Sequence, residues 1–368
     1  YSGTYGDYAV TVKEKGFRCY RNVFNIPDEA DASAICTFDI KLVPAAEGAW
    51  DGLTLTEPEK TDSVYNISTG AELAWFASHI NKDKPAAAYA KLVSDIDLAD
   101  YDWTPIGGAT LATGFNGWFD GDSLTVKGLY INQPETNYQA MFAYVNGHIS
   151  NLTVYGDVTG KQYTAGLVAM LGATGVVERC ENNVTVNALG SNSGGIAGSS
   201  YPKSTITNCI NNADITGLKY CAGITGNAGA FVRNCYSIGE ITGDGVGACL
   251  NGSSTTIKEG QVENVFCIKE YIFTQDQILV TEQQMASGEI AYLLGDAFGQ
   301  QIGTDPYPVL GGMKVFVTED GRYTNLPSGV SDIDSDGVVP EVVAVYGADG
   351  SRRTRLVPGL NILSLLDI

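Results

Sequence analysis

From Met141 to about Tyr271, apolar residues alternate with polar or small ones, and the whole pattern repeats. A short apolar phrase returns every 26 to 30 residues, as Ile149–Leu152, Val177–Cys180, Ile206–Cys209, Val232–Cys235 and Val262–Val265. The two-residue rhythm and the abundance of Ile, Val and Thr predict short strands rather than helices. A unit of this length cannot bury its apolar face alone, so we expect the units to stack as coils of a parallel β-helix.

Glycine-rich phrases recur between the apolar ones, as Ala165–Ala169, Gly194–Gly198 and Ala222–Gly226. The chain contains 44 glycines, which is many for an ordinary domain. Glycine tolerates positive φ and lets two backbones approach closely. These phrases therefore predict the corners between strands.

Two helices are predicted at the ends of the repeat region. The first begins with a capping box of Thr69 and Glu72, followed by an apolar stripe at Leu73, Phe76, Ala77 and Ile80. An exposed strand edge is a template for aggregation, so we expect this helix to cap the first coil. His79, on its flank, is interpreted as a surface or capping histidine rather than a catalytic one.

The second helix is predicted to begin with a capping box of Thr281 and Gln284 and to cover the lower part of the coil. Its apolar stripe is Ala286, Ile290, Leu293, Leu294 and Ala297. A strand pair is expected after it, over 307–310 and 313–317.

Three segments are expected. Residues 1–60 form a β-rich N-terminal segment, resembling the end of a β-sandwich, with strands over Ala9–Val12, Phe17–Phe24 and Ile35–Val43. Residues 61–325 form the right-handed parallel β-helix, and residues 326–368 form an acidic linker and a small C-terminal β-module. The fold class is therefore all-β, with capping helices.

The repeats resemble the GLUG-type repeats of bacterial cell-surface proteins. The resemblance includes Trp50–Gly52, Ile67–Trp75, Trp103–Gly107, Phe115–Gly121, Gly128–Ile131, Gln284–Gly288 and Ile302–Leu310, in that order. It implies a right-handed parallel β-helix, export and a role at the cell surface, but no catalytic activity. Arg179 departs from the pattern, because the other copies carry Asn at this position.

The C-terminal region contains two further motifs. Asp332–Gly337 matches the opening of a calcium loop, but Val343 stands where the closing Glu belongs, so an EF-hand is excluded and an acidic linker is favoured. The residues from Val345 to Arg353 and from Pro358 to Leu363 resemble the small β-modules that end many exported bacterial surface proteins.

Charge and hydropathy limit the partners. The formal charge of the 368-residue chain is −20, which argues against nucleic acid and anionic membranes as partners. No apolar run is long enough for a transmembrane helix. The chain begins at Tyr1 without a signal-like segment, so we expect a mature or truncated product, extracellular or on the bacterial surface, and monomeric.

Three of the eight cysteines, Cys180, Cys209 and Cys235, share a repeat position with Leu152 and Val265. Such a position is apolar, and side chains stacked on neighbouring coils have poor geometry for a bridge, so we expect free buried thiols. Cys19 and Cys36 either pair in an oxidising compartment or stay free, and the free state is favoured. With no Cys-x-x-Cys and only His79 and His148, no metal site and no cofactor are predicted.

Acidic side chains are the candidate chemistry. The carboxylates of Asp95, Asp97, Asp100 and Asp102 cluster at the first coil, where a glycosidase or a metal-dependent lyase would place them. A solvated acidic face is the favoured interpretation. A second set, Asp157, Thr185, Asp214, Glu240 and Glu270, is predicted to form an outward column. Such a column either binds a metal or a cationic ligand or is a solvated face, and the solvated face is favoured because Thr185 interrupts the carboxylates.

The sequence favours a non-catalytic adhesion or binding protein that engages a glycan or a neighbouring cell surface through the β-helix face. Tyrosines near the repeat corners suit sugar stacking, although tyrosine is also an ordinary strand residue; they are Tyr144, Tyr155, Tyr163, Tyr201, Tyr220 and Tyr236. No catalytic residue is assigned. The alternatives are a polysaccharide lyase or glycoside hydrolase, and a structural stalk.

Overall fold

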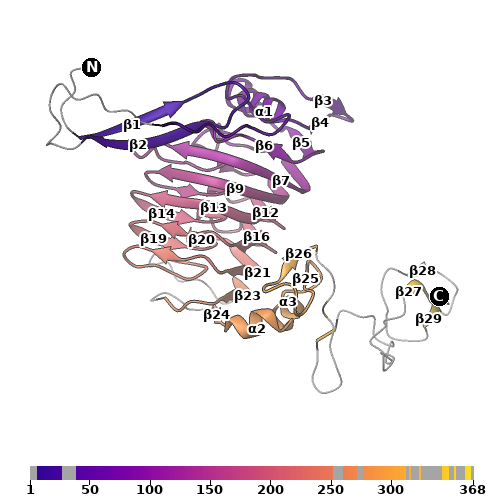
Figure 1. The fold of residues 1–368 in the computed structure, drawn as a ribbon. Helices are drawn as coiled ribbons and strands as arrows, with labels where there is room; N and C mark the ends of the chain where they lie inside the picture. Colours follow the sequence, from indigo (N-terminus) through magenta and orange to yellow (C-terminus); the bar gives the residue numbers. More distant parts are fainter. Residues whose placement is uncertain are drawn as a thin grey trace. The chain divides into compact units, whose positions relative to one another are not determined.

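The computed structural model describes residues 6–26, 39–251, 260–271, 277–311, 315, 323–324, 342–347, 352–353 and 361–365. Cys36 and the Asp332–Gly337 motif lie outside these residues. The chain divides into two compact units, one ending at Glu282 and the other beginning at Gln283. The first unit is a parallel β-solenoid of about seven turns, which confirms the predicted fold class (Figure 1).

Most of the solenoid strands belong to one 15-stranded sheet. Its strands are β3 (Glu59–Thr61), β4 (Val64–Ile67), β5 (Tyr89–Leu92), β6 (Ile96–Asp97), β7 (Trp118–Asn132), β9 (His148–Gly160), β12 (Val176–Glu178), β13 (Glu181–Ala188), β16 (Thr205–Thr207), β17 (Ile210–Asn211), β18 (Ile215–Thr216), β21 (Phe231–Ser237), β22 (Ile241–Thr242), β23 (Val262–Cys267) and β24 (Ile278–Leu279). All pairings in this sheet are parallel except that of β3 with β4.

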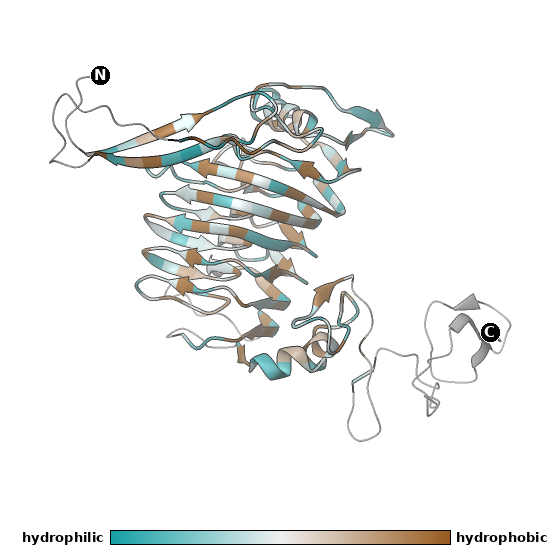
Figure 2. Cartoon of the chain, in the orientation of Figure 1, coloured by the Kyte–Doolittle hydropathy of each residue, from teal (hydrophilic) through white to brown (hydrophobic). Residues whose placement is uncertain are grey.

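Two smaller parallel sheets complete the coils. One contains β8 (Phe142–Val145), β11 (Val168–Leu171), β15 (Ala197–Ser200) and β20 (Thr225–Asn227). The other contains β10 (Thr164–Ala165), β14 (Ser191–Gly194) and β19 (Lys219–Ala222). Equivalent residues of successive coils therefore pair in register and stack as columns. Figure 2 shows the resulting alternation of hydrophobic and hydrophilic residues along the solenoid strands.

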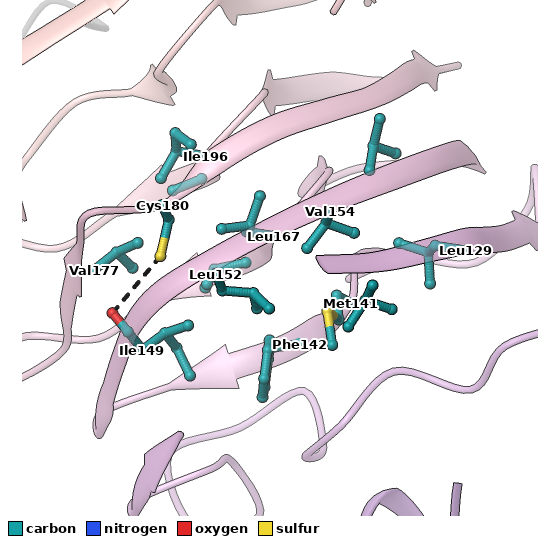
Figure 3. Close-up of a cluster of buried hydrophobic side chains, with 14 of the residues drawn as sticks. Leu129, Met141, Phe142, Ile149, Leu152, Val154, Leu167, Val177, Cys180 and Ile196 are labelled. Atoms are coloured by element: carbon teal, nitrogen blue, oxygen red, sulfur yellow. Dashed lines mark hydrogen bonds between the residues drawn. The ribbon is translucent and has the colours of Figure 1, made fainter. Parts of the chain in front are cut away.

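The predicted cysteine column lies in the core. Cys180, Cys209 and Cys235 are fully buried, as are Leu152 and Val265 in the same column, and none of the three thiols is bridged. Figure 3 shows Cys180 among aliphatic side chains, with its Sγ 3.9 Å from the carbonyl oxygen of Ile149. Burial raises the pKa of the Cys180 and Cys209 thiols well above the ordinary value. The predicted core position is confirmed.

A polar ladder is also buried in the core, beside the glycine-rich phrases. The amide Nδ2 of Asn182 donates to Oδ1 of Asn211 at 2.7 Å, and both residues are fully buried. A Cβ at Gly166 would lie only 1.7 Å from Oδ1 of Asn182. This glycine is therefore required by the close approach of the amide rather than by a turn.

The helix α1 (Gly70–Asp83) covers the first coils as predicted. Thr69 and Glu72 form the capping box, and Leu73, Phe76, Ala77 and Ile80 are buried. The ring of Phe76 packs against Phe115 and Phe119, with centroids 6.2 and 6.1 Å away. Its apolar stripe thus shields the end of the solenoid core.

An antiparallel hairpin of β1 (Gly6–Val12) and β2 (Tyr20–Ile26) precedes the solenoid. The second strand begins at Tyr20, later than the predicted Phe17. Residues 39–43, the described part of the third predicted strand, are not in a strand. The thiol of Cys19 is buried and free.

The second unit differs from the prediction in one helix. Two short helices, α2 (Glu282–Ala286) and α3 (Glu289–Leu294), replace the single expected one. Gly288, with φ 91°, separates them and changes the phase, so Met285, Ile290 and Ala291 are buried while Leu293 is exposed. Glycine interrupts a helix because its backbone is free to leave the right-handed region.

The strands of the second unit form two small antiparallel sheets. In one, β26 (Val309–Leu310) pairs with β25 (Phe298–Gly299). The strand predicted at 313–317 lies, except for residue 315, outside the described residues. The other contains β27 (Val342–Gly347), β28 (Arg352–Arg353) and β29 (Asn361–Leu365). The predicted C-terminal β-strands are present.

Candidate binding surface

The carboxylates of the first coil form a solvated acidic face only in part: Asp95 and Asp102 are exposed, but the prediction is wrong for Asp97. Asp97 is 8% exposed, and its Oδ2 lies 2.9 Å from Nη1 of Arg18. The same guanidinium binds Asp100 through two bonds of 2.7 and 2.9 Å. Hydrogen bonding to Asp100 raises the pKa of Arg18. The N-terminal segment therefore covers and neutralises these carboxylates.

Asp102 also has cationic partners. Its oxygens lie 2.5 Å from Nζ of Lys13 and 2.8 Å from Nη2 of Arg21. Burial favours a raised pKa for Asp102, but the hydrogen bond from Lys13 and the charge of Arg21 outweigh burial, so the pKa is lowered. A general acid needs the opposite shift. A hollow of about 510 Å³ beside these residues has Asp102 as its one lining carboxylate among the described residues.

Asp95, the fourth carboxylate, is exposed and accepts the backbone N–H of Thr125 at 2.8 Å. It connects two neighbouring coils. Each of the four carboxylates thus makes a structural contact, and Asp97 and Asp100 share Arg18.

The outward column is confirmed as exposed. Pairing places Asp157, Thr185 and Asp214 on successive coils, followed by Glu240. Glu240 lies 2.6 Å from Nζ of Lys269, and its backbone N–H donates to Asp214 at 2.7 Å. Burial and the charge of Asp100 raise the pKa of Asp157. Glu270 is exposed as well. Among the described residues, no group of acidic, histidine or cysteine side chains could hold a metal ion.

The two histidines have structural partners. His79 stacks on Trp75 with centroids 5.0 Å apart, while Nδ1 lies 2.7 Å from Asp83 and Nε2 lies 3.2 Å from the hydroxyl of Tyr65. Tyr65 is itself buried, with only 5% of its surface exposed. His148 lies 3.2 Å from Glu178.

A column of tyrosines at one corner of the solenoid is the feature that the sequence analysis did not isolate. Tyr138, Tyr163, Asn192 and Tyr220 are equivalent residues of successive coils, because the residues that follow them pair in register. All four have positive φ, at 61°, 55°, 66° and 52°. We call Tyr138, Tyr163 and Tyr220 the tyrosine corner.

The left-handed backbone makes tyrosine an unexpected choice here. This conformation costs a non-glycine residue roughly 1–2 kcal/mol, and asparagine tolerates it best among residues with side chains. A second corner of the same solenoid obeys that rule, with Asn at four of five positions (Asn151, Asn208, Asn234 and Asn264) and φ between 50° and 54°. The tyrosines are therefore not explained by the turn they occupy.

The second corner also explains the departure at Arg179. This residue adopts φ 50° like its asparagine neighbours, and its Nε donates to Oδ1 of Asn151 at 2.9 Å. Asn264 donates in the same way to Asn234 at 3.0 Å. A side-chain ladder between coils thus offsets the unfavourable backbone at this corner.

The rings of the tyrosine corner are partly ordered by each other. Tyr138 and Tyr163 stack with centroids 4.8 Å apart and an interplanar angle of 13°. Burial, followed by the neighbouring phenols of Tyr163 and Tyr201, raises the pKa of Tyr138. Tyr201 and Tyr220 are 47% and 36% exposed. Tyr138 and Tyr163 are half-buried against Ala140, Ala165 and Ala169, so Tyr220 is the most exposed ring of the corner, and Tyr201 lies near Tyr138.

The tyrosine corner had a signal in the sequence. Each of its residues stands two positions before a small residue, namely Ala140, Ala165 and Ala222, and Asn192 stands two before Gly194. The recurrence at a fixed offset distinguishes these tyrosines from Tyr236, which is buried, and from Tyr155, which is exposed on β9.

Comparisons with known proteins support the fold and leave the activity open. No protein-family model matches the chain. A curated protein of Evansella cellulosilytica, named "Putative Gly-rich membrane protein", is 29% identical over 150 residues, which is 38% of this chain and 17% of that protein. Within the described residues, no helix is long and apolar enough to cross a membrane.

A solved structure has the same fold. It is the crystal structure of a "putative immunoglobulin A1 protease" from Bacteroides ovatus, with a TM-score of 0.54 and 20% identity. The match covers 70% of this chain and 95% of that one. At this identity the likeness establishes the fold alone.

Proposed function

We propose that this chain is a non-catalytic binding protein of the bacterial cell surface that engages glycans through the tyrosine corner. The observation that carries the proposal is the left-handed φ of Tyr138, Tyr163 and Tyr220. Backbone strain that the fold tolerates at consecutive positions is typical of functional sites. Tyrosine rings offer apolar faces for sugar C–H groups and a hydroxyl for sugar oxygens.

Two observations favour binding over catalysis. The first-coil carboxylates are engaged by Arg18, Arg21 and Lys13, and Asp102 has a lowered pKa. His79 contacts Asp83 and a buried tyrosine, and His148 lies beside Glu178, so the observed partners of both histidines are structural.

A glycan array tests the proposal with the full chain and two matched variants. Tyr163→Asn introduces the residue that occupies the same corner in the next coil, Asn192. The substitution therefore keeps the fold and removes the ring. We expect binding about tenfold weaker for this variant, since a lost aromatic contact is worth about 1 kcal/mol or slightly more. Tyr155→Asn, which removes an exposed tyrosine outside the corner, serves as the control and keeps full binding.

The other outcomes are also decisive. Equal binding by wild type and by the triple variant Tyr138→Asn, Tyr163→Asn, Tyr220→Asn contradicts the tyrosine corner. Shortened glycans in the recovered product support a glycosidase or lyase instead. A folded chain that binds no glycan supports the structural stalk.

A further inference from the structure

A pocket of about 340 Å³ lies between α1 and the segment that precedes it, away from the tyrosine corner. Its walls include Trp50, Leu53 and Leu55 on one side, Trp103 on another and the helix residues Ser78 and Lys82. The volume suits a small molecule rather than a folded partner. Trp50 and Trp103 belong to two sequence phrases that the proposed function leaves unexplained.

One edge of the pocket, residues 50–54, is held in place by a turn. Oδ1 of Asp51 accepts the backbone N–H groups of Leu53 and Thr54 at 2.9 and 2.7 Å, and the indole N–H of Trp50 donates to the carbonyl of Thr54 at 2.9 Å. A Cβ at Gly52 would lie 2.4 Å from the ring of Tyr101. A side chain at that position would therefore displace this edge. Because the turn already orders the edge, little ordering is needed when a ligand binds.

The body of the ligand must be apolar. Both indole N–H groups are already satisfied by backbone carbonyls, that of Trp103 by Met141 at 3.3 Å, so the rings offer only carbon surface. Leu53 is 85% exposed and Leu55 is 46% exposed although both border the pocket. The turn keeps both leucines in water, so a ligand that covers them removes apolar surface from water, and this burial favours binding.

The rim supplies one positive charge. Lys82 is exposed, lies on α1 one turn after Ser78, and makes no ion pair with any described residue. The neighbouring Asp83 is engaged by His79. In a chain with a net charge of −20, an unpaired ammonium next to an apolar hollow is an anchor for an anion. The hydroxyl of Thr104 also lines the rim.

We propose that this pocket binds a small amphipathic anion, with an aliphatic or aromatic body between Trp50, Trp103 and Leu53 and a carboxylate at Lys82. Apolar burial provides most of the affinity, and the ammonium selects the charged end. The proposal is independent of glycan binding, because no residue of the tyrosine corner lines the pocket.

Displacement of a fluorescent anion tests the proposal in the full chain. Anilinonaphthalene sulfonate is titrated first, and decanoate and decanol then compete for it. We expect one saturable site, with decanoate about tenfold stronger than decanol, which corresponds to one charge-assisted contact. Lys82→Gln removes this preference, whereas Lys84→Gln, a neighbouring lysine that does not line the pocket, keeps it.

Leu53→Asn distinguishes ligand binding in the pocket from binding to other apolar surfaces. Leu53 is largely exposed, so the substitution leaves thermal unfolding unchanged and weakens both competitors. Binding that Leu53→Asn does not alter, or no saturable displacement by either competitor, overturns the pocket as a ligand site. Equal competition by decanoate and decanol overturns the assignment of an anion.

Discussion

Tyr163 and Asn192 occupy the same corner of consecutive coils, with φ of 55° and 66°. One residue is poorly suited to this backbone and the other is well suited. The chain thus contains both a tyrosine and the residue that this backbone favours. Exchanging one for the other changes the exposed side chain while the backbone conformation is kept.

The first prediction concerns the stability of Tyr163→Asn. Relief of the left-handed backbone and loss of the ring stack with Tyr138 are each worth about 1 kcal/mol and oppose each other. We therefore expect the free energy of unfolding, measured with urea, to stay within about 1 kcal/mol of wild type. Tyr236→Asn, at a buried strand position, should lose about 3 kcal/mol or more. Similar losses in both variants would mean that Tyr163 is a core residue.

The second prediction concerns Arg18. Arg18→Met leaves the buried carboxylate of Asp97 without its closest cation, and we expect a loss of about 2–3 kcal/mol. The value is below that of a fully buried pair because the Arg18 side chain is 26% exposed. Lys13→Met, which removes a half-exposed pair, should cost less than about 1 kcal/mol. If chemical denaturation shows equal losses, the cover over Asp97 is not a stabilising contact.

The third prediction concerns the cysteine column. Cys209→Asp buries an unpaired charge and should cost about 3–5 kcal/mol. Cys209→Val places the residue found at Val265 in the same column and should change stability by less than about 1.5 kcal/mol. Thermal unfolding measures both. An unchanged melting temperature for Cys209→Asp would contradict a buried column.

The fourth prediction concerns alkaline pH. Burial raises the pKa of Cys221 and Cys267 to about 11, above the value of about 8.5 for an unfolded thiol. The folded state thus retains protons that the unfolded state releases. The resulting stability is present below the unfolded pKa and is lost as pH rises towards 11. Cys221→Ala should flatten this limb of a pH-dependent unfolding series, and an unaltered slope would contradict the assignment.

The fifth prediction concerns salt and calcium. The charge of −20 should make the solenoid repel itself at low ionic strength, and sodium chloride near 0.1 M screens charges beyond about 10 Å. We expect calcium to stabilise no more than sodium at equal ionic strength. A rise of many degrees in melting temperature with calcium, reversed by a chelator, would instead indicate a bound ion.

The sequence predicted the parts of the fold that depend on local pattern. The two-residue rhythm located the strands, and Thr69 and Glu72 located the start of α1. The contact between Arg18 and Asp97 could not be predicted, because 79 residues separate them and no periodicity relates them. The prediction of a single helix after residue 281 was wrong, because the positive φ of Gly288 interrupts the helix although the apolar pattern continues past it.

The binding surface was predicted only by composition. Tyrosines were expected near the corners, but the sign of φ at Tyr138, Tyr163 and Tyr220 is a property of the folded backbone and has no signature in a single residue. Their shared offset from a small residue becomes informative only when the coils are aligned in register.

In-register stacking has a consequence for how such a chain changes over generations. Each corner residue is fixed by the coil before it and the coil after it, as in the pairing of β14 with β10 and β19. Duplication of the coil that carries Tyr163 would therefore add one tyrosine to the corner and leave the other positions unaltered. A single-residue deletion within a strand would instead turn the following side chains of that strand to the opposite face. The length of the tyrosine corner is therefore expected to change by whole coils.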